Sequence, residues 1–423
     1  MEKSLSERDR AVIWHPYTQM QTAALPIEIV SGEGSRLYTT DGTVLIDAVS
    51  SWWVTLHGHS HPYIAEKVSA QLNTLEHVIF AGFTHPSAVT LAERLLKILP
   101  EGQSKVFYSD NGSTAVEVAL KMCLQFWYNQ GKPKHKVIAF ENSYHGDTFG
   151  AMAVSARSAF TGPFEKLLFD VIYLPLPNAE NLEDLKQRLT DSMDEAACFI
   201  YEPLIQGAGG MLMYEAAHLN ELVKHCREIG LLTIADEVMT GFGRSGTLFA
   251  SLQITSKPDL VCLSKGLTGG TMPLGVTTCR EEIYNAFLSE DRYKTLFHGH
   301  SFTANPVACA ASLASLDLLE DPEAMRNIKR IEKAHQEFKN RIEKHPKVKN
   351  PRITGTIIAF DWETGSETSY FNSLRNTLYN YFLAEGILLR PLGNILYILP
   401  PLCITDDELA YIYNKIEHAL ERF

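Results

Sequence analysis

A lysine and an aspartate stand at corresponding places in this sequence, each at the end of an apolar run. Lys265 follows the run Leu-Val-Cys-Leu-Ser and precedes a Gly-Gly bend, and Asp236 follows the run Leu-Leu-Thr-Ile-Ala. Burial would disfavour the charged form of the lysine and leave an amine that can form an imine with a carbonyl group. A lysine in such a position is more often an ordinary loop residue, so the role of Lys265 must be inferred from the other residues of the motif.

The spacing of Asp236 and Lys265 leaves room for one crossover between neighbouring parallel strands, which would turn both side chains into one crevice. A carboxylate buried at such a strand end needs a cationic partner. Pyridoxal 5′-phosphate (PLP) supplies one, because its ring nitrogen must stay protonated while it acts as an electron sink. A helix-capping or salt-bridged aspartate remains the alternative. The pair therefore favours a PLP site that Lys265 anchors.

The segment KVFYSDNGSTAVEVALKM has the pattern of a strand, a tight turn and a helix. Gly112, Ser113 and Thr114 would open that helix. Exposed backbone N–H groups and the positive end of the helix dipole attract an anion at this place, and the hydroxyls add donors. An ordinary N-cap made by Ser113 explains the same residues equally well. We interpret the turn as a candidate phosphate site.

Two further strand ends carry side chains that suit the same crevice. Tyr144 follows the run Lys-Val-Ile-Ala-Phe-Glu-Asn-Ser and can stack on a flat cofactor ring, with His145, Gly146 and Asp147 shaping the turn. Glu202 ends another apolar run. Carboxylates at neighbouring strand ends are costly unless something cationic or protonated lies between them.

Two patterns suggest other chemistry but lack its context. Residues 241–246 match G-x-G-x-x-G, but a dinucleotide site needs these glycines directly after a strand, and five residues intervene after the apolar run. His57, His59 and His61 alternate, yet Gly58 and a following proline break regular structure and no cysteine joins them. We therefore expect turn histidines that bond to backbone, and no metal.

Composition excludes several classes of protein. The chain has 423 residues, 45% of them hydrophobic, and a net charge of −12, which disfavours nucleic acid as a partner. It shows neither a signal peptide nor the roughly 18 uninterrupted apolar residues of a membrane span. Its seven cysteines are scattered and odd in number, as expected for small buried side chains in a reducing compartment. We expect a cytoplasmic protein.

The elements that must position these residues alternate between residues 104 and 280. Short apolar runs such as CFIYEP and LLTIADE are separated by helical patterns at residues 113–128 and 217–229. Buried strands that alternate with helices predict an α/β fold with a mainly parallel sheet covered on both faces. In such sheets ligands bind where strands end.

The last third has a different pattern. Helical stretches at residues 305–342 precede short strand candidates, and residues 405–422 predict a closing helix. This order suggests a smaller α+β domain, with which the strand-like first 50 residues would pack. The expected division is an N-terminal segment 1–50, a large PLP-binding domain 51–309 and a C-terminal small domain 310–423.

Several of these motifs together resemble the class III aminotransferases, which have PLP fold type I with a mainly parallel seven-stranded sheet. The likeness covers nearly the whole chain. It rests on residues 236–244, 264–266, 112–115 and 144–146, and on Glu202-Pro203 and Asn305-Pro306. It implies PLP as the cofactor, Lys265 as its anchor and proton carrier, and Asp236 as the partner of the ring nitrogen.

A narrower likeness is to the branch of that family that serves biotin synthesis. It rests on residues 14–20 (WHPYTQM), 51–54 (SWWV) and 389–391 (LRP). This branch implies transfer of the amino group of S-adenosylmethionine to 8-amino-7-oxononanoate in a ping-pong scheme. Lysine as donor remains open, as does another class III activity on ornithine, 4-aminobutyrate or ω-amino acids. A PLP-dependent racemase or mutase is a more distant alternative.

The resemblance also implies a substrate site. Tyr17, which the likeness makes a catalytic residue, would line an apolar channel for a nine-carbon chain together with Trp52 and Tyr144. The planar guanidinium of Arg390 would bind the carboxylate at the far end of that chain. Core packing is the alternative for Trp52 and Trp53.

Finally, the resemblance implies a homodimer with shared active sites. A hydroxyl from one subunit reaches the phosphate in the other, and the corresponding segment here contains Gly299, His300 and Ser301. Many relatives have Pro-Thr in place of His300-Ser301. We expect His300 and Ser301 to contact the cofactor and Gly299 to contact the substrate.

Overall fold

The computed structural model describes residues 3–365, 368 and 372–423. Its largest sheet has seven strands, and every strand except β12 runs in the same direction. The order across the sheet is β4 (Gln103–Ser109), β12 (Gly275–Arg280), β11 (Leu260–Leu263), β10 (Leu232–Asp236), β7 (Ala196–Tyr201), β5 (Lys136–Phe140) and β6 (Val171–Leu174). The expected mainly parallel seven-stranded sheet is confirmed.

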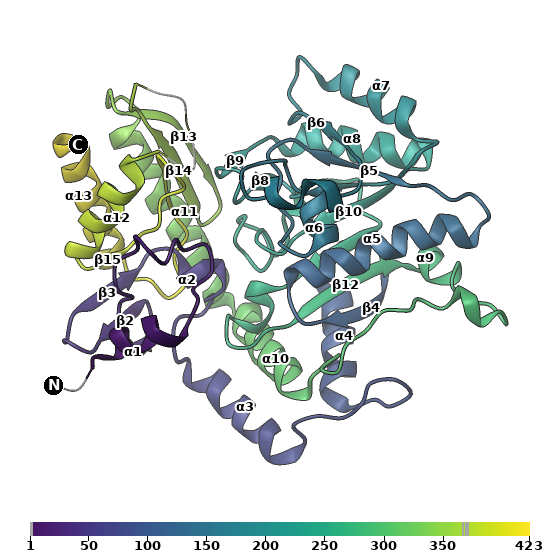
Figure 1. Ribbon diagram of the computed structural model, residues 1–423, viewed down its shortest axis with the longest axis horizontal. Helices are drawn as coiled ribbons and strands as arrows, with labels where there is room; N and C mark the ends of the chain where they lie inside the picture. The colour runs from purple at the N-terminus through teal and green to yellow at the C-terminus, as the bar shows by residue number, and fades with distance from the viewer. Residues whose placement is uncertain (1–2, 366–367, 369–371) are drawn as a thin grey trace.

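Helices cover both faces of this sheet (Figure 1). One face packs on α5, through buried residues such as Val116 and Ala119, and the other packs on α8 and α4. Every residue of β7, β10 and β11 is buried, which explains why these strands are continuous apolar runs. The helices of this part are α3 (Pro62–Thr74), α4 (Pro86–Ile98), α5 (Gly112–Asn129), α6 (Phe149–Val154), α7 (Leu182–Ser192), α8 (Ala216–Ile229), α9 (Glu281–Asn285) and α10 (Pro306–Glu320).

A second, smaller lobe contains a three-stranded antiparallel sheet with helices packed on it. Figure 1 shows this lobe on the left of the view, beside the large sheet. The sheet order is β13 (Val348–Thr354), β14 (Ile357–Trp362) and β16 (Ile395–Ile398). Its helices are α11 (Pro322–Ile342), α12 (Leu374–Ala384) and α13 (Asp406–Arg422).

The N-terminal strands lie against the C-terminal elements. β1 (Ile29–Glu33), β2 (Arg36–Thr39) and β3 (Val44–Asp47) form a sheet whose fourth strand is β15 (Ile387–Leu388). β15 pairs in parallel with β3, and Figure 1 shows the purple N-terminal strands beside the yellow-green C-terminal ones. We therefore propose a small domain made of residues 1–50 and 310–423, and a large domain made of residues 51–309. The boundary falls within α10, which packs on α3 and α4 of the large domain and leads into the small one.

The remaining elements are short. Within the described residues they are α1 (Leu5–Val12), α2 (Ser50–Trp53), β8 (Ile205–Gln206), β9 (Leu212–Met213) and the 3-10 helices Gly162–Leu167, Ala250–Gln253, Lys265–Thr268 and Arg292–Lys294. α2 is distorted, because Ser50, Ser51 and Trp53 all have positive φ. Among the described residues, no helix combines the length and the apolarity needed to cross a membrane.

Candidate active site

Lys265 lies where β11 ends, at the first residue of a short 3-10 turn. Its backbone has φ of 47°, a left-handed conformation that is uncommon for a residue with a side chain and often marks a functional position. The ammonium nitrogen lies 4.7 Å from the centre of the Trp53 ring. Burial of the amine lowers the pKa of Lys265 to about 8, although the carboxylates of Asp236 and Glu202 oppose that shift.

Asp236 is the last residue of β10, and β10 pairs in parallel with β11. Its Cα partner across the pair is Cys262, three residues before Lys265. The two side chains therefore come from adjacent parallel strand ends, as their spacing predicts. Asp236 is buried; its Oδ2 lies 2.7 Å from Nδ1 of His145, and its Oδ1 accepts the backbone N–H of Val238 at 3.1 Å.

Glu202 is the second buried carboxylate at this edge of the sheet. It accepts the backbone N–H groups of Tyr144 and Gly207, at 3.0 and 2.9 Å, and burial raises its pKa to about 7. His145 reduces the unfavourable energy of burying the two neighbouring carboxylates together. Its ring bonds Asp236, and a positive charge on it would lower the pKa of Glu202. Sequence reasoning gave His145 only a role in shaping the turn.

The first turn of α5 lies beside the turn that contains Tyr144. Asn111, and not Ser113, caps the helix, since its side chain accepts the N–H of Thr114 at 2.9 Å. The alternative of an N-cap at Ser113 is therefore wrong. The Ser113 hydroxyl instead accepts the backbone N–H of Asp147 at 3.2 Å, which ties the helix start to the neighbouring turn.

Two glycines allow the close approach of these segments. A Cβ at Gly146, whose φ is +133°, would lie 2.0 Å from the Ser113 hydroxyl oxygen. A Cβ at Gly112 would lie 2.7 Å from a methyl group of Val238. Glycine is therefore required at both positions, because any side chain would push the helix start away from the strand ends.

These groups surround a cavity of about 430 Å³. Its lining includes Trp53, Asn111, Gly112, Ser113, Tyr144, His145, Glu202, Asp236, Val238 and Lys265. The residues fit PLP: a buried amine for its aldehyde, a buried carboxylate for its ring nitrogen, and a helix N-terminus for its phosphate. The Nε2 atom of His145 is buried without a hydrogen-bond partner in the described part of the chain, so a polar neighbour at this site would be favourable.

A second cavity of about 630 Å³ adjoins the first and also reaches Lys265. We call it the inner substrate cavity. It brings together Tyr17, Trp52, Tyr144 and Arg390, the residues expected to bind substrate. The Arg390 guanidinium lies 4.6 Å from the centre of the Trp52 ring, and the Tyr17 ring meets the edge of Trp52 at 5.5 Å.

Asp147 is a residue of this cavity that sequence reasoning left in the turn. The Tyr17 hydroxyl donates a hydrogen bond to its carboxylate, and the Tyr144 hydroxyl lies 3.3 Å from that of Tyr17. The position of Asp147 directly after the Tyr-His-Gly motif is the signal that could have identified it. The contact joins the N-terminal segment to the large sheet at the cavity wall.

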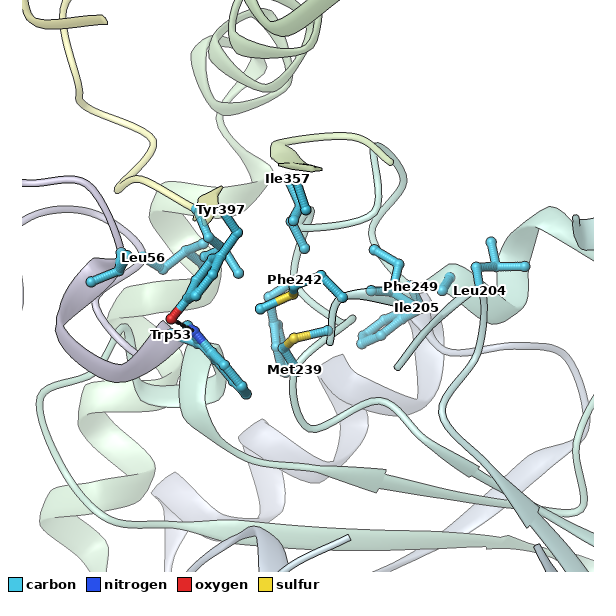
Figure 2. Close-up of a cluster of buried hydrophobic side chains, with 14 of the residues drawn as sticks. Trp53, Leu56, Leu204, Ile205, Met239, Phe242, Phe249, Ile357 and Tyr397 are labelled. Carbon is cyan, nitrogen blue, oxygen red and sulfur yellow. Dashed lines mark hydrogen bonds between the residues drawn. The ribbon is translucent and has the colours of Figure 1, made fainter. Parts of the chain in front are cut away.

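The two adjacent tryptophans have different environments. Trp53 is 5% exposed; its indole N–H donates to the Tyr397 hydroxyl at 3.0 Å within a buried apolar cluster (Figure 2). Trp52 is 41% exposed and lines the inner substrate cavity. Core packing therefore accounts for one side of Trp53, which also lines both cavities, and it does not account for Trp52.

The expected residues Gly299, His300 and Ser301 lie apart from this site. They form an irregular segment before α10, and none of them lines either cavity in the described part of the chain. Gly299 and Ser301 are exposed. Within one chain, the structure does not bring this segment to Lys265.

Two of the three alternating histidines bond to side chains, whereas Nδ1 of His61 is buried without a hydrogen-bond partner among the described residues. His57 lies 3.0 Å from the Ser315 hydroxyl, and His59 lies 2.9 Å from Asp47. The expectation that backbone groups satisfy these rings is therefore wrong for His57 and His59. Burial lowers the pKa of His57 to about 3, so its ring is neutral in the folded protein.

Comparison with known proteins agrees with this geometry. A model of the class III aminotransferase family matches residues 17–420, and the chain belongs to that family. Class III aminotransferases depend on PLP, so this chain is a PLP-dependent aminotransferase.

Among similar proteins is the adenosylmethionine-8-amino-7-oxononanoate aminotransferase of Synechococcus elongatus, which is 49% identical over 97% of this chain and 98% of that protein. The crystal structure of the enzyme of the same name from Methanocaldococcus jannaschii has a TM-score of 0.95 and 35% identity, covering 99% of this chain and 98% of that one. The crystal structure of an omega transaminase from Pseudomonas jessenii in complex with PMP has a TM-score of 0.92 and 27% identity. The match covers 99% of this chain and 98% of that one.

Proposed function

We propose that this chain transfers the amino group of S-adenosylmethionine to 8-amino-7-oxononanoate and so forms 7,8-diaminononanoate for biotin synthesis. The observation that carries the proposal is the inner substrate cavity, whose lining contains both Lys265 and Arg390, the latter stacked on Trp52. A chain with a ketone near one end and a carboxylate at the other suits this arrangement. The relatives of the same name at 49% and 35% identity support it.

In this proposal, separate residues of the cofactor cavity hold separate parts of PLP. Lys265 would hold PLP covalently, Asp236 would keep the ring nitrogen protonated, and the first turn of α5 at Gly112 and Ser113 would hold the phosphate. The aromatic ring of Tyr144 would stack on the cofactor ring. Bound PLP supplies an electron sink for the electrons of the carbon that carries the amino group.

Lys265 also carries the proton that the reaction moves. Its pKa of about 8 lies close to neutral pH, so the amine can take a proton from the α-carbon of the donor and give one back later. His145 keeps Asp236 oriented through the 2.7 Å contact. Donor and acceptor use the same cavity in turn, as a ping-pong scheme requires.

The side chains that line the inner substrate cavity would determine which substrates bind. Tyr17, Trp52 and Tyr144 offer aromatic surface to the carbon chain, and Arg390 offers a planar cation to its carboxylate. The hydrogen bond from Tyr17 to Asp147 would hold the tyrosine against the large sheet while the donor binds. Tyr17 is therefore placed to contact whichever substrate lies next to Lys265.

A homodimer with shared active sites and a cytoplasmic location are part of the proposal. Gly299, His300 and Ser301 would complete the site of the neighbouring subunit, where the Ser301 hydroxyl and His300 would contact the phosphate and Gly299 the substrate. In support, the exposed Phe297 and Phe302 flank this segment, as is common at interfaces. Six of the seven cysteines are buried and all are free thiols, which suits a reducing compartment.

The donor can be identified on the purified holoenzyme without any acceptor. We expect S-adenosylmethionine to abolish the absorbance of lysine-bound PLP, and 8-amino-7-oxononanoate to restore it. An unchanged spectrum with S-adenosylmethionine and bleaching by lysine would overturn the donor. Bleaching by ornithine or 4-aminobutyrate, with no recovery on adding 8-amino-7-oxononanoate, would favour a different class III aminotransferase.

A further inference from the structure

A third cavity, of about 1120 Å³, lies beyond the aromatic wall of the inner substrate cavity. Its lining includes Arg10, His15 and residues 17–20 and 22–27 from the N-terminal segment, and α12 with Asn372 and Ser373 directly before it. It shares Tyr17, Trp52, Val54, Phe160 and Arg390 with the inner substrate cavity, so the two spaces meet at these side chains. We call this space the outer cavity.

The charges of the two cavities differ. The described lining of the inner substrate cavity contains both signs of charge, with Asp147 as well as Arg157 and Arg390. The described lining of the outer cavity contains Arg10, Arg375 and Arg390 but no aspartate or glutamate. A cavity lined by one sign of charge concentrates a ligand of the opposite sign.

Arg10 is the cation that α1 contributes to the outer cavity, and it is exposed. Its guanidinium donates to the backbone carbonyls of Ala23 and Met20, at 3.0 and 2.7 Å, which hold it in one orientation. Both acceptors are neutral, and Arg10 makes no ion pair within the described part of the chain. A fixed arginine without a carboxylate partner is ready to bind one.

We propose that the outer cavity binds the carboxylate end of a chain-like amino acceptor, and that Arg10 acts there as a second cation outside Arg390. This inference rests on the proposed function, because that acceptor carries an amine beside its ketone and a carboxylate at the far end. A positive outer cavity favours the orientation in which the carboxylate points outward and the ketone inward to Lys265. Arg10 is then a specificity-determining residue for the acceptor and not for the donor.

The test compares variants of the holoenzyme in the two half-reactions. In Arg10→Gln we expect kcat/KM for 8-amino-7-oxononanoate to fall roughly threefold to tenfold at low ionic strength, and less at high ionic strength. S-Adenosylmethionine carries a net positive charge, so its kcat/KM should stay unchanged or rise. Arg10→Lys keeps the charge and should recover most of the loss. Arg8→Gln, on the same helix but outside the cavity lining, is the matched control.

Two outcomes would overturn the inference. An acceptor kcat/KM in Arg10→Gln equal to that of the unaltered enzyme would exclude a role for the charge. An equal loss in Arg10→Lys and Arg10→Gln, or an equal loss for donor and acceptor, would mean that Arg10 only holds the N-terminal segment in place.

A binding measurement keeps this test separate from the proposed function. Nonanoate has the nine-carbon chain and the carboxylate but no reacting group, so calorimetry reports its binding to the holoenzyme without turnover. Weaker binding to Arg10→Gln than to Arg8→Gln would support the outer carboxylate site even if 8-amino-7-oxononanoate proved not to be a substrate. Equal binding to both variants would overturn the site even if the proposed reaction were confirmed.

Discussion

Lys265 shows how burial alone prepares a residue for chemistry. An exposed lysine with an ordinary pKa is almost entirely protonated near neutral pH and is a poor nucleophile. Here the protein around the amine lowers the pKa to about 8. Asp236 and Glu202 limit that shift without reversing it, so the same group can attack a carbonyl carbon and still carry a proton afterwards.

This shift has a measurable consequence in the cofactor-free protein. We expect the rate at which Lys265 captures PLP to rise with pH up to about 8 and then to level off, because only the neutral amine attacks. Stopped-flow absorbance between pH 6 and pH 10 would measure it. A rate that keeps rising to the ordinary lysine pKa of 10.5 would contradict the buried environment.

The same residue can be tested by substitution. Lys265→Ala should abolish capture of PLP and lower turnover by roughly a thousandfold or more, since proton transfer at the substrate is lost with the anchor. Lys224→Ala, at an exposed position on α8, is the control and should leave both unchanged. Retained activity in Lys265→Ala would refute the assignment.

At the scale of elements, the cofactor cavity depends on how closely three segments approach. The start of α5, the turn after β5 and the end of β10 meet where Gly112 and Gly146 have no side chain. The bond from the Asp147 N–H to Ser113 locks two of them together. Helix and strand propensities bring each segment near the site, but the fit between them depends on a few ångströms of backbone approach.

A single methyl group should therefore separate these segments. We expect Gly146→Ala to weaken PLP binding at least roughly tenfold, because the new Cβ would overlap the Ser113 hydroxyl. Titration of cofactor-free protein with PLP measures the affinity. Gly131→Ala also has a positive φ but meets no atom within 4 Å, so it should cost only backbone strain, roughly 1 kcal/mol, and leave PLP affinity unchanged. Equal affinities in the two variants would contradict the steric explanation.

At the scale of the whole molecule, the substrate cavities lie where residues from distant parts of the chain meet. The N-terminal segment supplies Tyr17 and Arg10, the large sheet supplies Lys265 and Asp147, and the segment after β15 supplies Arg390. The parallel pairing of β3 with β15 fixes the first and last of these relative to one another. Substrate binding is therefore sensitive to the arrangement of both lobes, whereas the cofactor residues belong to the large one.

The proposed sharing of active sites in a homodimer can be tested by mixing two inactive proteins. If Ser301 acts in the neighbouring subunit, a mixed dimer of Lys265→Ala and Ser301→Ala has one site with both native residues. Random exchange of subunits should then restore about a quarter of the unaltered activity at limiting PLP. If both residues act within one subunit, the mixture should show no more activity than the two separate proteins.

Several features follow from local sequence and were predicted from it. The apolar runs that end at Asp236, Glu202 and Lys265 are strands because a residue covered on both faces must be apolar throughout. The helix predicted at residues 113–128 is observed as α5, Gly112–Asn129, and the closing helix at 405–422 as α13, Asp406–Arg422. β12 and α12 were not predicted, because neither has a pattern that distinguishes it from its neighbours.

The sequence by itself determined the α/β class, the strand-end positions of Lys265 and Asp236, and the family to which they belong, since these depend on periodicity and on motifs of contiguous residues. Only the tertiary structure decided that Asn111 caps α5, that His145 bonds Asp236, that Trp52 is half-exposed while Trp53 is buried beside Lys265, and that Arg10 shares a cavity with Arg390. These features depend on left-handed backbone residues and on contacts between segments far apart in the chain. Left-handed residues and long-range contacts leave no periodic pattern in the sequence, because they depend on how distant segments pack and not on neighbouring residues.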